Sequence, residues 1–180
     1  MRKLTYEEIL SERISDTDFI LKAKAPINVI LHNVRSMYNV GSFFRTCDSA
    51  SINELILTGY TPYPPRKEID KTALGATKTV KWSYESDIIA AINLQKQKGY
   101  KVFAVELTDR KRLYNSLAID DYPLCLVFGN ELIGIDDDVI AECYDSLEIP
   151  MYGTKHSLNV AVAGGIVIYE ALHCWKSFEK

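Results

Sequence analysis

Residues 124–134 read LCLVFGNELIG, five apolar residues followed by a glycine, two polar residues, two more apolar residues and a second glycine. An uninterrupted apolar run of this length, ended by a turn residue, is typical of a strand buried on both faces. Gly129 lets the backbone approach a ligand closely, and Glu131 is expected at the carboxyl edge of the sheet. The stretch therefore predicts a buried strand that delivers polar side chains to its carboxyl end.

Similar apolar runs recur along the chain and alternate with stretches that have helical spacing. The other predicted strands are 27–31, 55–58, 102–105 and 147–149, and the predicted helices are 40–49, 87–98, 137–143 and 157–178. In the last helix, Gly164 and Gly165 indicate a position where something packs closely. Strands and helices that alternate in this way form a parallel sheet flanked by helices. The predicted fold class is therefore α/β.

The length of 180 residues, with 47% hydrophobic and 25% charged residues, is typical of one globular domain. Thr5, followed three residues later by Glu8, has the form of a capping box and predicts a helix from Tyr6 to about Arg13. We therefore expect residues 1–180 to be a single domain with a short amino-terminal helical extension over about 1–26.

No apolar run has the length of a signal peptide or of a membrane span, so a cytoplasmic protein without a membrane partner is expected. The four cysteines lie far apart and include no Cys-x-x-Cys pair. This spacing offers no metal site, and we expect reduced thiols in the core.

The net charge of -3 gives no support to nucleic-acid binding, so any basic surface must be local. Residues 66–81 hold five basic and two acidic side chains, whereas 131–148 hold seven acidic residues and no Lys or Arg. The basic run lies in a long, proline-containing connection from Gly59 to Trp82, and long ordered loops are often functional. A solvated face is the alternative interpretation of either run.

Two further motifs lie near predicted strand ends. Residues 39–46 read NVGSFFRT, and IPM at 149–151 is followed by SLNV at 157–160. Alone, each is weak, because a capping Asn and a solvated Arg explain the first equally well. At the carboxyl edge of a parallel sheet, however, such side chains are placed where open α/β folds bind ligands.

Together and in this order, the three motifs resemble the signature motifs of the SpoU-type, TrmH-like RNA 2′-O-ribose methyltransferases of the SPOUT superfamily. The resemblance runs from about residue 27 to 174 and includes KTALGA at 71–76 and VELT at 105–108. It implies methyl transfer from S-adenosyl-L-methionine to a ribose 2′-hydroxyl of RNA, without a metal. It also implies a carboxyl-terminal trefoil knot around the cofactor pocket and a homodimer. Transfer RNA is favoured over ribosomal RNA, because the third motif resembles the transfer-RNA branch.

Carried over residue by residue, the resemblance implies two sets of site residues. The positions that match catalytic residues are Asn39, Arg45, Glu131, Ser157 and Asn159. The positions that match the cofactor pocket are Thr108, Gly129, Ile149, Met151 and Leu158. In the basic run, the residues predicted to contact RNA are Arg66, Lys71 and Lys78. Each also has an ordinary explanation, such as a helix cap for Glu131 or Ser157 and a turn for Asn159.

Arg45 is interpreted as a phosphate clamp and electrostatic stabiliser, because a guanidinium is effectively always protonated and makes a poor base. His32 and His156 are possible bases, but isolated histidines are more often structural. Two other classes of protein share this alternation of strands and helices. A doubly wound nucleotide-binding enzyme would carry a Gly-x-Gly-x-x-Gly or Walker loop, which the chain lacks. A non-catalytic RNA-binding or assembly protein of the same fold, or a ribosomal-RNA enzyme, remains the alternative.

Overall fold

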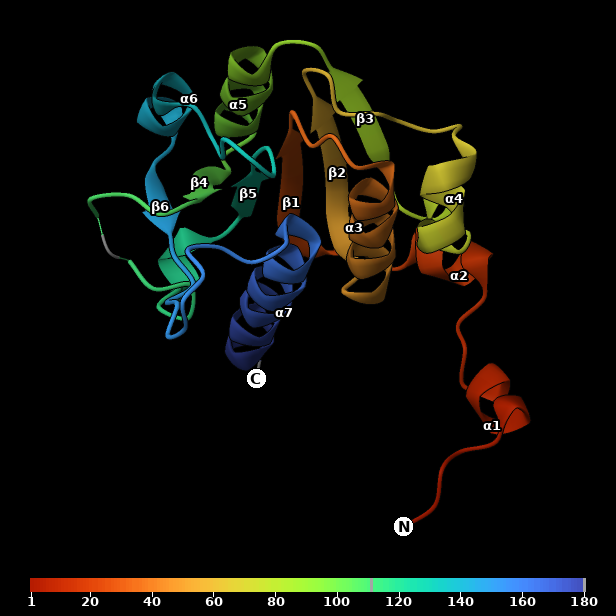
Figure 1. Cartoon of the computed structure of the whole chain (residues 1–180). Coiled ribbons are helices and arrows are strands. Elements are labelled where there is room, and N and C mark those ends of the chain that lie inside the picture. The colour runs from red at the N-terminus through yellow and green to blue at the C-terminus, as the bar shows by residue number, and fades with distance from the viewer. Residues whose placement is uncertain (111, 180) are drawn as a thin grey trace.

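One sheet runs through the molecule, and every neighbouring pair of its strands is parallel (Figure 1). The computed structural model describes residues 1–110 and 112–179, in which six strands follow the order β3-β2-β1-β5-β4-β6. The strands are β1 Ala25–His32, β2 Ile52–Thr58, β3 Trp82–Glu85, β4 Lys101–Val105, β5 Leu124–Phe128 and β6 Asp145–Leu147. The predicted α/β class is confirmed.

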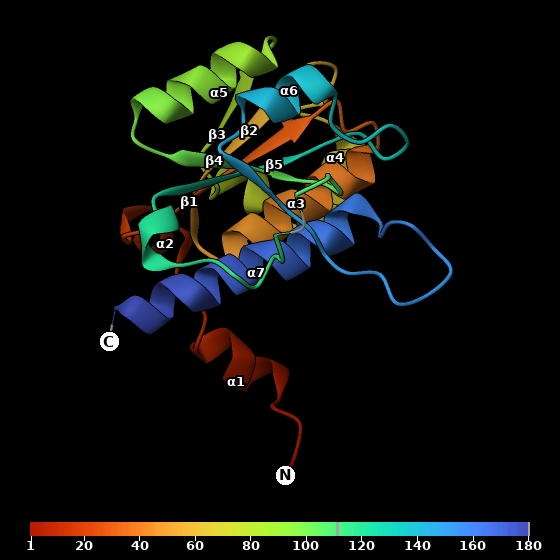
Figure 2. The same ribbon diagram turned by 90° about the vertical axis from the view of Figure 1, so that its left-hand side faces the viewer.

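Helices cover both faces of the sheet (Figure 2). One face packs against α3 Met37–Ser49, α4 Lys67–Ala73 and α7 Val160–Phe178, and the other against α5 Ile88–Gln97 and α6 Asp137–Glu142. Two short 3-10 helices, η1 Ala76–Lys78 and η2 Ile119–Asp121, lie in connections. The sheet is thus buried on both sides, as its apolar strands predict.

The strand order reverses between β1 and β5. After β1 the chain adds β2 and then β3 on one side of β1. It then crosses to the other side of β1, where it forms β4 and returns to place β5 between β4 and β1. The segments that follow β1 and β5 therefore meet at the same edge. In open α/β sheets this switch point is where ligands bind.

The packing of α3 and α7 follows from their apolar stripes. In α3 the buried residues include Val40, Phe43, Phe44 and Cys47, at helical spacing. A methyl group added to Gly164 of α7 would overlap the Phe43 ring, so this glycine lets the two helices approach closely. The close packing predicted for the final helix is present at Gly164, whereas the space beside Gly165 is open.

Two short helices precede β1, α1 Tyr6–Ser11 and α2 Asp16–Leu21. The capping box of α1 is confirmed: Glu8 N donates to Thr5 Oγ1 at 3.2 Å, and Thr5 N donates to Glu8 Oε2 at 2.7 Å. The predicted end near Arg13 was two residues too late, and α2 was not predicted. Neither helix contains a buried residue, and α1 lies apart from the sheet (Figure 1).

Other boundaries differ from the predicted ones for local reasons. The connection from Gly59 to Trp82 contains α4 and η1, and it leads into β3, an edge strand too exposed to show an apolar run. The last strand ends at Leu147 and not at Ile149. The final helix begins at Val160, because Asn159 is its N-cap. No helix in the described part of the chain is long and apolar enough to cross a membrane.

The cysteines are free thiols, with Cys47 and Cys125 fully within the core and Cys143 and Cys174 partly buried. Burial raises the pKa of the Cys143 thiol to about 11 and that of the Cys47 thiol further still. The expectation of core thiols is confirmed for Cys47 and Cys125, whereas Cys143 and Cys174 lie at the margin of the core.

Candidate active site

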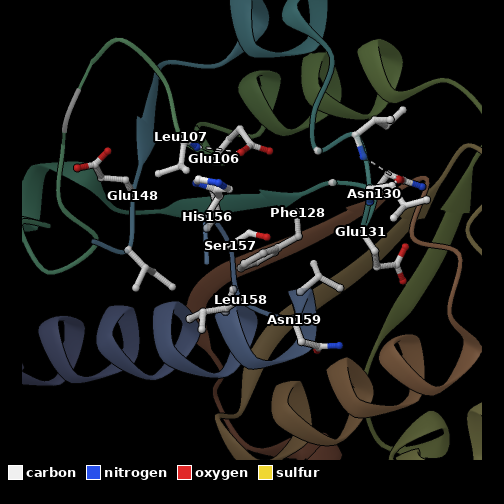
Figure 3. A pocket seen from close by; sticks show the side chains of 18 of the residues that line it. Glu106, Leu107, Phe128, Asn130, Glu131, Glu148, His156, Ser157, Leu158 and Asn159 are labelled. Atoms are coloured by element: carbon white, nitrogen blue, oxygen red, sulfur yellow. Dashed lines mark hydrogen bonds between the residues drawn. The ribbon is translucent and has the colours of Figure 1, made fainter. Parts of the chain in front are cut away.

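A pocket of about 500 Å³ opens at the carboxyl ends of β4, β5 and β6 and is closed on one side by the start of α7 (Figure 3). Its walls are segments 105–107, 128–134, 147–149 and 156–160, together with Met151 and Ala163. The pocket lining includes three exposed apolar side chains, those of Leu107, Ile133 and Leu158. Pockets of this volume, mostly apolar with a few polar groups, are typical small-molecule sites.

The turn after β5 has a defined backbone. Asn130 N donates to Gly134 O at 3.0 Å, and Gly134 N donates back to Asn130 O at 2.9 Å. A Cβ atom on Gly129 would overlap the Gly134 carbonyl, so this glycine is required by the turn itself. The close neighbour of this Cβ position is the chain's own backbone, and Gly129 also lines the pocket.

Glu106, the residue after β4, fixes the end of this turn by hydrogen bonds. Its Oε2 accepts from Ile135 N at 3.2 Å, and its Oε1 accepts from Leu107 N at 2.9 Å. The VELT motif at 105–108 predicts no role for Glu106. A carboxylate directly after a buried strand is the sequence feature that could have indicated a role. In the structure, this carboxylate holds backbone N–H groups in and beside the pocket wall.

A chain of three side chains joins the predicted motifs. Asn39 Nδ2 donates to Glu131 Oε1 at 2.9 Å, and Asn159 Nδ2 donates to Asn39 Oδ1 at 3.2 Å. Glu131 also accepts from the backbone N–H groups of Arg35 at 2.9 Å and Ser36 at 3.0 Å. The carboxylate therefore ties the turn after β5 to the start of α3, at the switch point of the sheet.

Hydrogen bonding sets the charge of Glu131. Burial raises the pKa of its carboxyl, but the bonds from Arg35, Ser36 and Asn39 outweigh burial and leave the pKa below its ordinary value. Glu131 is therefore ionised at neutral pH and acts as an acceptor. The helix-cap interpretation of Glu131 holds in part, since the carboxylate binds N–H groups next to the α3 N-cap, Ser36.

Asn159 is fixed at both ends of its amide. Its Oδ1 accepts from Ala161 N at 2.9 Å and Val162 N at 3.3 Å, which makes it the N-cap of α7. Its Nδ2 is then directed at Asn39. The N-cap expected at Ser157 is thus two residues further on, and Ser157 is an exposed residue of the pocket wall.

Of the ten predicted catalytic and cofactor residues, seven line the pocket: Gly129, Glu131, Ile149, Met151, Ser157, Leu158 and Asn159. Asn39 joins them through its hydrogen bonds. Thr108 does not line the pocket. Its hydroxyl lies 2.6 Å from Ser146 Oγ and donates to Arg110 O at 3.0 Å, because the chain turns away from the pocket after Leu107.

Arg45 lies outside the pocket. It is exposed on α3, and it lines a separate hollow of about 430 Å³ together with Lys71, Thr72 and Tyr169. The fold therefore brings Arg45 and Lys71, predicted from different motifs, into one basic hollow between α3, α4 and α7. Arg66 borders another hollow, and Lys78 is exposed in η1.

Of the three histidines in the chain, the two considered as bases have different surroundings. His32 is buried, and its Nδ1 and Nε2 lie 2.9 Å from Thr58 Oγ1 and Asn33 Nδ2. Burial lowers its pKa, more than Asp136 and Asp138 raise it, so it is a neutral structural group. His156 lines the pocket and is exposed. Among the described residues, no three His, Cys, Asp or Glu side chains converge as metal ligands would.

A parallel sheet with a ligand-sized pocket at its carboxyl edge, and a polar network at its switch point, defines an α/β domain built to bind a small molecule. The sequence profile of the SpoU rRNA Methylase family matches residues 26–169. The chain belongs to this family, which confirms the predicted resemblance.

Individual relatives agree with this assignment. The chain is 29% identical over 172 residues to the tRNA (guanosine(18)-2'-O)-methyltransferase of Thermus thermophilus, covering 94% of this chain and 81% of that one. It is 30% identical over 169 residues to the enzyme of the same name from Aquifex aeolicus, covering 91% and 77%.

Solved structures give the same result. The A. aeolicus TrmH/SpoU tRNA modifying enzyme superposes with a TM-score of 0.81 at 26% identity, covering 95% of this chain and 86% of that one. An AdoMet-bound rRNA methyltransferase from Sinorhizobium meliloti superposes with a TM-score of 0.78 at 27% identity, covering 86% and 59%.

Proposed function

We propose that the chain transfers a methyl group from S-adenosyl-L-methionine to a ribose 2′-hydroxyl of RNA, with transfer RNA favoured over ribosomal RNA. The observation that carries the proposal is the network Glu131–Asn39–Asn159, which joins all three family motifs at the edge of the pocket. The preference for transfer RNA rests on the names of the Thermus and Aquifex relatives.

The pocket fits the cofactor. Its volume of about 500 Å³ lies within the range of roughly 300–1,000 Å³ for small-ligand sites. Ile149, Met151 and Leu158 offer apolar contact, and the 128–134 turn offers backbone polar groups. When bound, S-adenosylmethionine supplies an electrophilic methyl group on a positively charged sulfur.

Each predicted cofactor residue has a place in this proposal. Ile149, Met151 and Leu158 hold the ligand by side-chain contact, and Gly129 keeps the turn in its tight conformation. Thr108 acts indirectly, because the hydrogen bond between its hydroxyl and that of Ser146 holds the segment after β4 in position.

A ribose hydroxyl is a poor nucleophile until its proton is drawn away. We assign Arg45 to gripping an RNA phosphate and so aligning the hydroxyl, since positioning and electrostatic stabilisation need no loss of its proton. Ser157 lines the pocket and orients the ribose, and Asn159 acts through its hydrogen bond to Asn39. Glu131, ionised and engaged by three donors, fixes Asn39, and the proton passes to water or to an RNA phosphate oxygen.

Arg66, Lys71 and Lys78 are proposed to contact the RNA backbone. Lys71 shares its hollow with Arg45, which supports a common phosphate track over α3 and α4. All three side chains are exposed. In a chain of net charge -3, such local basic surfaces are where RNA can bind.

We also propose a homodimer that pairs through α7. Val162 and Tyr169 are 52% and 49% exposed and share one stripe of the helix with Gly165. A second copy of the chain would cover this stripe. A single catalytic domain with a short helical extension, a carboxyl-terminal trefoil knot and a cytoplasmic location complete the proposal.

The proposed activity is tested with purified protein, tritiated S-adenosylmethionine and two unmodified RNA pools, transfer RNA and ribosomal RNA. We expect label in transfer RNA, released on digestion as a 2′-O-methyl nucleoside. Label on a base, or no incorporation into either pool, would contradict the proposal. Label in ribosomal RNA alone would overturn the substrate preference.

A further inference from the structure

The hollow bordered by Arg66 lies beside the active-site pocket, between the exit of β2 and the edge strand β3. It measures about 400 Å³ and is lined by Tyr60, Tyr63, Tyr84, Arg35 and Arg66, among others. We call it the aromatic hollow. Its lining includes two cationic side chains and no acidic one.

The three tyrosines are held in place while part of each ring stays open to solvent. Tyr84 Oη donates to Gly59 O at 2.7 Å, and Tyr60 Oη accepts from Asn130 Nδ2 at 2.9 Å. The Tyr63 ring centroid lies 4.7 Å from that of Tyr84 and 6.5 Å from that of Trp82. Yet Tyr60, Tyr63 and Tyr84 remain 58%, 44% and 42% exposed. The Tyr63 and Tyr84 rings are inclined by 42° to each other, so the tyrosines form a fixed, angled aromatic surface.

The two arginines are available to an anion. Within residues 1–110 and 112–179, neither guanidinium takes part in an ion pair. Arg35 uses only its backbone N–H to bind Glu131, so its exposed side chain is free of the active-site network. Arg66 is the N-cap of α4 without a side-chain capping bond.

The aromatic hollow and the active-site pocket share one turn. Asn130 binds Tyr60 from one side of this turn, and Glu131 binds Arg35 N next to it. Asn130 and Glu131 also line the pocket. Neighbouring nucleotides of one RNA strand, each with a base and a phosphate, have the groups to occupy both places at once.

We propose that the aromatic hollow binds an unpaired base of the RNA substrate, stacked on Tyr63 and in contact with the tilted ring of Tyr84, with its flanking phosphates on Arg35 and Arg66. Every base has a π-face, so aromatic stacking of this kind tolerates sequence variation, and single-stranded RNA is recognised in this way. The inference rests on the proposed function and deepens it. The substrate must present an unstacked nucleotide close to the methylated ribose.

The first test compares Tyr63→Leu with the matched control Tyr63→Phe in binding unmodified transfer RNA. The hollow predicts affinity about tenfold weaker for Leu, which lacks a π-face, and within about twofold of wild type for Phe. Affinity for S-adenosylmethionine should stay unchanged in both. Full RNA affinity in the Leu variant, or equal losses in both variants, would overturn the stacking role.

A second measurement uses the wild-type protein and does not depend on any variant folding. Ring-labelled tyrosine resonances are followed by NMR on addition of single-stranded hexa-adenylate. Tyr63 and Tyr84 should shift, whereas Tyr6 on α1 should not. Equal shifts with a hexamer duplex, or shifts that include Tyr6, would overturn the proposal. This binding needs no turnover. If Tyr63 and Tyr84 shift but the protein does not methylate RNA, the stacking site is supported and only the proposed methyl transfer is refuted.

The phosphate contacts are tested by salt dependence. Arg35→Gln and Arg66→Gln should each reduce the slope of log affinity for single-stranded RNA against log salt by about 0.7. Lys96→Gln, on α5 at the other face of the sheet, is the control and should leave the slope unchanged. Unaltered slopes in both arginine variants would show that neither arginine contacts a phosphate.

Discussion

The side-chain amide of Asn39 donates a hydrogen bond to Glu131 Oε1 at 2.9 Å, and this bond joins the helix after β1 to the turn after β5. The two residues lie 92 positions apart in the chain. Their contact depends on β5 lying directly beside β1. Catalysis by this chain should therefore be sensitive to either residue.

Replacing Glu131 with Ala should slow methyl transfer and also weaken the fold. It leaves the N–H groups of Arg35 and Ser36 without their acceptor, at a cost of about 1–3 kcal/mol. Asn39→Ala should slow the reaction with a smaller loss of stability, because both backbone bonds remain. Turnover at saturating RNA and thermal unfolding measure the two effects. Unchanged turnover in both variants would show that the network is only structural.

Replacing Arg45 with Ala should lower methyl transfer by roughly 10²-fold or more, about 3 kcal/mol, with cofactor affinity almost unchanged. Arg45→Lys should also lose most of the activity, because a point charge lacks the bidentate grip of a guanidinium. Lys22→Ala, at the exposed C-cap of α2, is the control for a lost surface charge. Near-full turnover in the Lys variant would rule out the clamp, and full recovery at saturating RNA would make Arg45 a binding residue.

Filling the pocket should abolish cofactor binding without unfolding the protein. Wild type is expected to bind S-adenosylmethionine in the micromolar range, about −8 kcal/mol. Leu158→Trp should remove the heat of binding in calorimetry, because Leu158 lines the pocket and is 37% exposed. Leu94→Trp, at a 49% exposed position on α5, is the matched control. Retained binding in the Leu158 variant would place the cofactor elsewhere.

Acid should weaken the fold partly through Glu131. Its pKa lies below the ordinary value of 4.5 in the folded chain. The resulting stability is thus present above pH 4.5 and is lost as the pH falls through the folded pKa. Glu131→Gln should flatten the decline in unfolding free energy below about pH 4.5, as measured by urea titrations. Glu7→Gln on α1 is the control, and parallel curves for wild type and Glu131→Gln would contradict the assignment.

The proposed dimer predicts a sedimentation coefficient for two chains at micromolar concentration. A charge at Val162 or Tyr169 should separate them, because burying an unpaired carboxylate is costly. Val162→Glu and Tyr169→Glu are therefore expected to sediment as monomers, and Leu94→Glu as wild type. Sedimentation of the wild-type protein as a monomer would contradict the proposed dimer.

The sequence by itself determined the fold class and much of the strand pattern. LCLVF at 124–128 became β5 with unchanged bounds, because an apolar run is a local signal of a buried strand. The capping box at Thr5 was equally local. Edge strand β3 and helix α2 escaped prediction because neither carries a continuous apolar run or a buried face.

Only the tertiary structure decided how the motifs combine. Strand order places Asn39, Glu131 and Asn159 in one network, although Asn39 and Asn159 are 120 positions apart. It also separates Arg45 from the pocket and turns Thr108 toward Ser146. Periodicity and length specify what each segment becomes. Which segments meet depends on the crossover from β3 to β4 and the return to β5, and no local pattern encodes that choice.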